Sequence, residues 1–365
     1  MSVILWALAA IPLDMTPNQV NHLNIGLMFA SLVAAFILPF EMFLLSYAIL
    51  GPLHYLTEMS WLHDRNYFMP KRWMAIPIGI LTLIALLSSG YLPEDVTDYL
   101  PAWLQSETLM PWNAESVFAA LCLALVFVIT KTAKARYIGL AIVLVGTIAA
   151  HFINYKVRGL FGGNDSYFPI TMYDVFFTIF LTTIIHVFVF TGAFVLLGAL
   201  KGKSRSGMVS FVVFLACAVA CFVVPVDSVP VLSADTTTAY NNTSRMLDAM
   251  MLFYGTGEPL ESYNDVYTTS GGVMVARLIA FAYTYHYLNW FSKTSIIRWH
   301  DVPRLRLVAV VVIWIVSLVL YGMDYLLGLK WLLLLSMLHV FLEFPLNWQS
   351  LFGIKAELMK RLYVP

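Results

Sequence analysis

The chain has 365 residues, of which 60% are hydrophobic and only 12% are charged, and its 21 basic residues balance its 21 acidic residues. Soluble domains carry about 25% charged residues, so this composition excludes an ordinary soluble enzyme and predicts a helical membrane protein. The zero net charge argues against a nucleic-acid-binding protein.

The apolar residues gather in runs long enough to cross a bilayer, which takes about 20 residues of helix. Residues 1–13 are also apolar, but they are short and follow no Lys or Arg, so we expect a surface or re-entrant segment there rather than a cleavable signal peptide. Pro39 separates the first two long runs, which we interpret as a tight helical hairpin. The runs are 22–38, 41–61, 74–92, 114–131, 136–155, 171–199, 208–226, 271–292, 305–325 and 329–350. We therefore predict an all-α fold, a polytopic transmembrane helical bundle of about ten spans in one integral membrane domain over residues 1–365.

The charged residues between the runs predict the orientation of the spans. Basic residues follow every even-numbered run, whereas acidic residues dominate most of the other links, as the positive-inside rule requires of cytoplasmic and outer loops. The basic residues concerned are Arg65, Lys71, Arg72, Lys131, Lys134, Arg136, Lys201, Lys203, Arg205, Lys293, Arg298, Arg304, Arg306, Lys355, Lys360 and Arg361. Lys156 and Arg158 are the exception. The pattern predicts that both termini are cytoplasmic, and we expect the protein in a bacterial inner (plasma) membrane.

The long segment 227–270 is predicted to face outward. Residues 227–242 are rich in Asp, Ser, Thr and Pro and are typical of a surface loop. Residues 243–255 have the pattern of a short amphipathic helix that lies on the membrane surface.

Two of the apolar runs contain the same pair of polar residues. His54 and Glu58 lie four positions apart, and so do His339 and Glu343, which places each pair on one helix face. A carboxylate inside a membrane helix costs about 2.5 kcal/mol or more. The chain accepts this cost twice beside a histidine, which indicates that each carboxylate has a partner such as a metal ion or a proton.

A third run adds His286, and all five side chains are expected in the cytoplasmic half of the bundle at similar depth. Imidazole and carboxylate groups together suit iron, zinc or manganese. We therefore predict a metal site formed by His54, His286, His339, Glu58 and Glu343, with His186 as a further nitrogen ligand. Glu58, Glu343, Tyr55 and Tyr287 are the candidate catalytic residues. The alternative is that each pair forms only a hydrogen bond within its helix.

A second polar group is predicted toward the outer side. Arg277 would not stay unpaired inside a span, so we expect it to pair with Asp174 or Asp324. We interpret His151, Asn154 and Tyr155 as residues of the membrane interface.

Residues 51–61, GPLHYLTEMSW, resemble the His-x-x-x-acid signature of the Brp/Blh family of membrane β-carotene dioxygenases. The resemblance covers His54 and Glu58, and it departs from the family at Tyr55, where the family has Gly, and at Glu58, where it has Asp. It implies a polytopic bundle in which histidines from several helices hold an iron ion.

Two main functions compete on the sequence alone. The first is a membrane-embedded metalloenzyme, a non-haem iron oxygenase type that uses iron or another first-row divalent metal and acts on a hydrophobic or lipid-like substrate. The second is a proton-coupled transporter in which the same carboxylates titrate. A structural subunit of a membrane complex is the third. Membrane lipid and a hydrophobic small molecule are the expected partners, with no nucleic acid.

Overall fold

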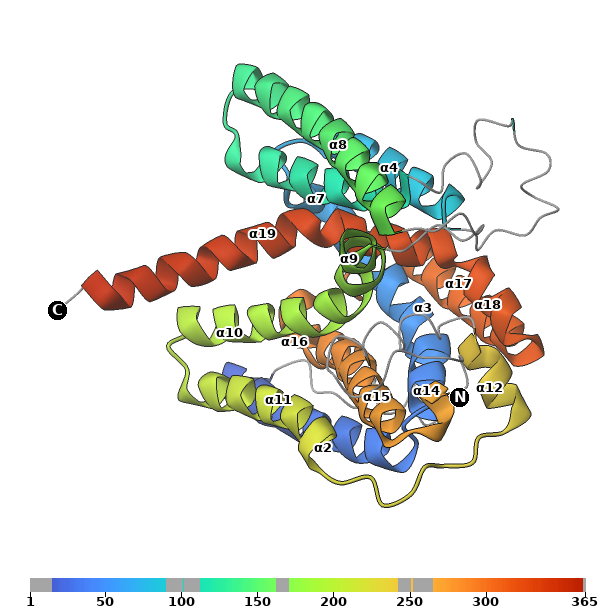
Figure 1. Ribbon diagram of the computed structural model, residues 1–365. Coiled ribbons are helices and arrows are strands. Elements are labelled where there is room, and N and C mark those ends of the chain that lie inside the picture. The colour runs from blue at the N-terminus through green and yellow to red at the C-terminus, as the bar shows by residue number, and fades with distance from the viewer. Residues whose placement is uncertain are drawn as a thin grey trace. The chain divides into compact units, whose positions relative to one another are not determined.

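The computed structural model describes residues 15–89, 101, 112–161, 171–241, 251 and 265–363. Every regular element in these ranges is a helix, which confirms the all-α prediction for this part of the chain (Figure 1). The elements are α2 (Pro17–Ile37), α3 (Glu41–Asp64), η1 (Asn66–Phe68), η2 (Arg72–Met74), α4 (Ala75–Leu87), α7 (Asn113–Ile129), α8 (Ala133–Phe161), α9 (Met172–Asp174), η5 (Val175–Phe190), α10 (Thr191–Lys201), α11 (Arg205–Val223), α12 (Ala234–Asn241), α14 (Asp265–Thr268), α15 (Ser270–Ser292), α16 (Thr294–Ile297), α17 (Arg304–Met323), α18 (Tyr325–Trp331) and α19 (Leu333–Tyr363).

The helices form two compact units, each assembled from separate stretches of the chain. Unit 1 comprises Met1–Glu58, Val187–Leu329 and Phe352–Pro365, and unit 2 comprises Met59–His186 and Lys330–Leu351. The boundaries between the units fall inside α3, η5, α18 and α19.

Unit 1 is organised around α15, most of whose residues are buried. Helix α15 packs against α2 and α11, and α11 packs in turn against α2 and α10 (Figure 1). In α2, one buried residue recurs every three or four positions, from Val20 to Ala35, as expected for a helix that presents one face to its neighbours. Helix α15 instead is buried on all sides, so its polar residues lie in the interior of the unit.

Unit 2 contains α4, α7 and α8, with α7 packed between the other two (Figure 1). Helix α7 buries Glu115 together with a row of small apolar residues. The N-terminal half of α19 also belongs to unit 2 and contributes Trp348, whose indole N–H donates to the carbonyl of Leu121 at 3.0 Å.

The helices that contain the predicted ligands depart from regular α-helix. Helix α3 includes Pro52 and helix α19 includes Pro345, and a proline inside a helix removes one backbone hydrogen bond. The segment η5, which contains His186, is wound as a π-helix. π-Helical turns are rare and are often found at functional sites.

Five helical segments are long and apolar enough to cross a membrane, by length and composition, and a bent pair of helices gives a sixth. The five are Pro17–Ile37, Ala133–Asn154, Met172–Lys201, Arg205–Val223 and Arg304–Met323, and the bent pair is Tyr325–Trp331 with Leu333–Leu362. These features are those of an integral membrane protein. Two shorter apolar helices, Arg72–Leu87 and Asn113–Ile129, coincide with predicted spans. Helices α3 and α15, which contain His54, Glu58 and His286, also coincide with predicted spans.

One detail of the predicted outline is wrong. Residues 234–241, expected in a surface loop, form helix α12, in which Ser233 accepts a hydrogen bond from the backbone N–H of Thr236, as an N-cap does. The last predicted span, 329–350, falls in the bent pair of helices α18 and α19. The predicted segment 1–13 and the surface helix 243–255 lie outside the described residues, except for Met251.

Candidate metal centre

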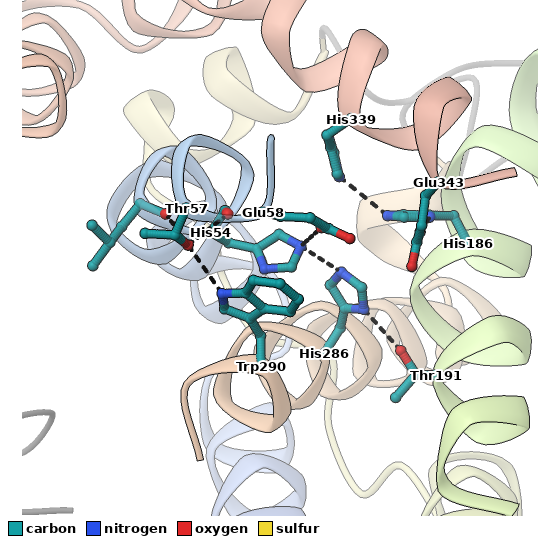
Figure 2. Close-up of polar contacts among 10 residues, drawn as sticks. His54, Thr57, Glu58, His186, Thr191, His286, Trp290, His339 and Glu343 are labelled. Atoms are coloured by element: carbon teal, nitrogen blue, oxygen red, sulfur yellow. Dashed lines mark hydrogen bonds and ion pairs between the residues drawn. The ribbon is translucent and has the colours of Figure 1, made fainter. Parts of the chain in front are cut away.

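In unit 1, three potential metal ligands meet at the imidazole of His54. Glu58 Oε2 lies 3.0 Å from His54 Nε2, and His286 Nε2 lies 3.0 Å from the same nitrogen (Figure 2). Helix α3 supplies His54 and Glu58 because a spacing of four places them one turn apart, and α15 supplies His286. None of the three residues is more than 7% exposed.

The protons available do not satisfy these three atoms with neutral imidazoles and an ionised carboxylate. If His54 Nε2 carries a proton, that one N–H faces two acceptors, the Glu58 oxygen and the His286 nitrogen. If His286 Nε2 carries the proton instead, the lone pair of His54 Nε2 faces the carboxylate oxygen. An added cation removes this conflict, because all three atoms are ligands for a metal ion.

The distances also fit a metal centre. Two ligand atoms that are each about 2.1 Å from an ion are about 3.0 Å apart when they subtend 90°. The two separations from His54 Nε2 have this value, although hydrogen bonds have similar lengths.

Neighbouring side chains hold the two imidazoles in place. The second nitrogen of His286, Nδ1, lies 2.8 Å from the hydroxyl of Thr191 on α10, which leaves Nε2 as the atom directed at His54. The indole ring of Trp290 stands edge-on to His54, with ring centroids 5.4 Å apart, and its N–H donates to Thr57 at 3.0 Å (Figure 2). A hydrogen bond to the second ring nitrogen, such as that between Thr191 and His286, fixes the tautomer and orientation of a ligating histidine.

In unit 2, two further imidazoles and a carboxylate are in contact. His186 Nε2 and His339 Nε2 lie 3.2 Å apart, and His186 Nδ1 lies 3.0 Å from Glu343 Oε2 (Figure 2). All three side chains are buried. The alternative of a hydrogen bond within the helix between His339 and Glu343 is not observed, and both residues contact His186 instead.

Glu343 differs from Glu58 in which nitrogen it meets. It contacts the Nδ1 atom of His186 and so leaves Nε2 as the atom that faces His339. Glu343 therefore lies beside the nitrogen of His186 that does not face His339, whereas Glu58 lies beside the nitrogen of His54 that also faces His286. A carboxylate near the second nitrogen of a ligating histidine is in the usual place for an orienting residue.

Buried His and Glu side chains among the described residues could thus hold a metal ion. The ligand atoms are imidazole nitrogen and carboxylate oxygen, and no cysteine takes part: Cys122, Cys217 and Cys221 are free thiols. This donor set is compatible with iron, zinc or manganese.

The two predicted catalytic tyrosines lie at different places in unit 1. The ring of Tyr287 is 5.1 Å from that of His54 and 5.4 Å from that of His286. Tyr55 is buried, and its charge interactions are with other tyrosines, among them Tyr321 and Tyr47. Tyr287 therefore adjoins the imidazoles directly, and Tyr55 lies in the tyrosine cluster behind it.

Two buried polar residues near the predicted ligands, Thr191 and Asn347, were not identified from the sequence. Thr191 is separated from His286 by 95 positions, so no spacing rule connects them. Asn347 lies four positions after Glu343 on the same face of α19, and it is 1% exposed. Neither polar atom of its carboxamide has a hydrogen-bond partner among the described residues. Its position in the series 339, 343, 347 is the signal that could have identified it.

The outer polar group is arranged differently from the prediction. The Arg277 guanidinium donates to the carbonyl of Val224 at 3.0 Å and packs over the ring of Phe36. Asp324 accepts from the backbone N–H of Leu327 and is exposed, so it begins α18 rather than neutralising Arg277. The pairing of Arg277 with Asp324 is therefore wrong.

Asp174 belongs to a buried polar cluster in unit 2. Its carboxylate accepts from Asn154 at 3.0 Å and from the backbone N–H of Thr171 at 2.9 Å. Asn154 also donates to Glu115 at 3.4 Å, and the ring of His151 lies against Trp112 and 3.6 Å from Glu115. His151 and Asn154, expected at the interface, thus contact a fully buried carboxylate.

Comparisons with protein-family models, with curated proteins and with solved structures find no match to this chain.

Proposed function

We propose that this protein is a membrane-embedded metalloenzyme, a non-haem iron oxygenase type that acts on a hydrophobic or lipid-like substrate. One observation carries the proposal: Glu58 Oε2 and His286 Nε2 both lie 3.0 Å from His54 Nε2 inside a helical unit with almost no exposure to solvent. In this assignment His54, His286 and Glu58 ligate. Within unit 2, His186 and His339 supply further imidazole nitrogens, with Glu343 beside His186.

The physical case for a metal rests on charge. An ionised carboxylate in an apolar interior is costly unless it is paired, and Glu58 has an uncharged or weakly basic imidazole beside it. A divalent cation neutralises the carboxylate and binds neutral imidazoles without burying a second anion.

Iron is the metal that this donor set favours for catalysis. Two histidines and one carboxylate with open positions are the ligands of non-haem Fe(II) oxygenases, and such an ion supplies dioxygen activation when bound. The residues around it would then exclude water and position the substrate. Tyr287 and Trp290 form an aromatic wall beside His54.

A hydrophobic substrate follows from the proposed environment. Unit 1 contains three of the helices that could cross a membrane, so a substrate would reach the site through lipid. We further propose ten spans with both termini in the cytoplasm of a bacterial cell, on the charge pattern of the loops.

Elemental analysis of the purified full-length protein tests the proposal. We expect about one or two first-row metal ions per chain, predominantly iron. His54→Ala should lose most of the metal, because a small set of ligands leaves no substitute for a missing one. His63→Ala is the matched control, since His63 is a partly exposed histidine on the same helix. Wild type without stoichiometric metal, or equal metal in both variants, would refute the metal centre.

The buried carboxylates of unit 2 favour a proton-coupled carrier as a second candidate. Glu115 and Asp174 share Asn154 as a hydrogen-bond donor, and a carboxylate in such a place can be protonated during a transport cycle. Asp174→Asn mimics the protonated state. If the metal is absent and this variant loses proton movement in reconstituted vesicles, the carrier is correct. If metal is present and no proton moves in the wild type, it is excluded.

A further inference from the structure

Unit 1 contains a cavity of about 750 Å³ that is separate from the residues of the metal centre. It lies where the beginning of α2, the end of α10, the beginning of α11 and the end of α15 come together. Helix α11 contacts α10, α2 and α15, and all four helices are labelled in Figure 1. Sites for small molecules have volumes of about 300 to 1,000 Å³. The cavity is thus large enough for a small polar ligand or a lipid headgroup.

The side chains that line this cavity are basic or neutral. His22, Lys203, Arg205 and Lys293 contribute to its wall, and among the residues that the structure describes no Asp or Glu does. A cavity with basic groups and no carboxylate attracts anions.

Lys293 has no internal partner for its charge. It follows the last residue of α15, and its side chain makes no hydrogen bond or ion pair with another residue that the structure describes. Burial lowers the pKa of the Lys293 ammonium to about 8, because charging a buried group without a counter-ion is unfavourable. A bound anion would supply that counter-ion.

A network of neutral polar side chains joins α2 to the beginning of α11 at the wall of the cavity. Asn21 donates to Ser204 at 3.2 Å and to Ser206 at 3.0 Å, and Ser206 donates to Asn18 at 2.8 Å. Ser204 is also the N-cap of α11, a helix of 19 residues. The first turn of a helix presents backbone N–H groups and the positive end of the helix dipole, both of which favour negative charge.

The turn between α10 and α11 gives an independent indication. Lys203 has a φ of 46°, a left-handed conformation in which glycine is favoured and other residues are strained. The chain places a lysine there, and its side chain contributes to the cavity. A function for the positive charge explains why the strained position is not a glycine.

We propose that this cavity binds a phosphate group, carried either by an anionic lipid headgroup or by a soluble phosphorylated molecule. Lys293, Lys203 and Arg205 supply the positive charge, and the backbone N–H groups of the first turn of α11 supply the neutral donors. The proposal is independent of the metal centre.

The test uses purified, delipidated full-length protein in a neutral detergent. Inorganic pyrophosphate probes the soluble source, and mixed micelles of phosphatidylglycerol against phosphatidylcholine probe the lipid source. Isothermal titration calorimetry measures the first, and native mass spectrometry counts bound lipid in the second. Saturable pyrophosphate binding assigns a soluble ligand, and selective retention of phosphatidylglycerol without pyrophosphate binding assigns a headgroup.

Variants link the binding to the cavity. Lys293→Gln should weaken binding about tenfold or more, as loss of a charged hydrogen bond does, and Lys134→Gln, at an exposed position in unit 2, should not change it. Lys203→Gly should also weaken binding while it maintains or raises the melting temperature, because glycine relieves the positive φ. Absence of binding by both probes, or equal binding by all four proteins, would overturn the proposal.

Discussion

The Nε2 atoms of His54 and His286 face each other at 3.0 Å across two helices of unit 1, although 232 positions separate the residues in the chain. Their rings are nearly perpendicular, with an interplanar angle of 75°. The two nitrogens meet through their in-plane lone-pair directions rather than by stacking, which is the approach that two ligands make to a shared ion or proton. This contact gives the most direct expectations for mutagenesis.

Thr191→Val should weaken metal binding without abolishing it. The Thr191 hydroxyl holds His286 Nδ1 at 2.8 Å, and loss of such an orienting partner typically costs about 10- to 100-fold in metal affinity. His286→Ala should remove most of the metal. Chelator competition measures both. Thr82→Val is the matched control, because Thr82 is buried but bonds only within its own helix, and a control that lost metal equally would contradict the role of Thr191.

Glu58→Gln and Glu343→Gln should differ in their effect. Glu58 meets the Nε2 side of His54, so glutamine removes a ligand anion and most of the bound metal should be lost. Glu343 meets the Nδ1 side of His186, away from the nitrogen that faces His339, so the loss should be smaller. Metal content and chelator-dependent melting report the difference. Identical behaviour of the two variants, or no chelator effect on the wild type, would remove the distinction between ligand and orienting residue.

Gly272→Ala should destabilise unit 1. A Cβ atom at Gly272 would lie 1.8 Å from the backbone oxygen of Val266, and a backbone atom cannot move aside as a flexible side chain can, so we expect a loss of about 3 kcal/mol or more. At Gly26 nothing lies within 4 Å of the same atom, and Gly26→Ala should gain about 0.5 to 1 kcal/mol. Thermal unfolding in detergent compares the two variants. Equal melting temperatures would contradict the close approach of Gly272 to the backbone oxygen of Val266.

Anion binding in the cavity should weaken as the pH rises through about 8. Lys293 binds an anion only when protonated, and its pKa is lowered to about 8, so sulfate affinity should fall about tenfold between pH 7 and pH 9. Sulfate is used because it does not titrate in this range. The other basic groups that line the cavity, His22, Lys203 and Arg205, remain in Lys293→Gln. That variant should therefore bind weakly with little pH dependence, and a pH profile like that of the wild type would exclude Lys293.

Ser233→Cys should be labelled from outside sealed cells, and Lys134→Cys only after lysis. Both positions are exposed, and the loop charges place the first outside and the second in the cytoplasm. The measurement uses a membrane-impermeant thiol reagent on a chain whose native Cys122, Cys217 and Cys221 are replaced. The reverse pattern would invert the topology.

The positions of many helices could be predicted from the sequence, because the length of an apolar run can be read from consecutive residues. Pro39 lies between α2 and α3, as predicted, because proline cannot continue a helix without loss of a hydrogen bond. Helix α12 was missed because its Ser, Asp and Thr residues are typical of loops, and a single cap at Ser233 was needed to recognise its start.

The sequence identified residues of the candidate site, but it did not identify all the contacts that they make. His54 with Glu58 has a one-turn spacing that indicates a contact, and the contact is present. The same spacing at His339 and Glu343 gave the wrong partner, because spacing identifies a shared face and not the element packed against it. His186 comes from η5, a distant part of the chain. Such tertiary contacts depend on packing that no local pattern encodes.

The prolines of α3 and α19 have a mechanical consequence. Pro52 lies two residues before His54, and Pro345 lies two residues after Glu343. Each proline removes one backbone hydrogen bond of its helix. The two helices can therefore bend most easily next to His54 and Glu343, whose side chains belong to the candidate site. In the proposed metalloenzyme, a small flexure of the backbone at these prolines would accommodate a change in ionic radius while the imidazole rings keep their rotamers.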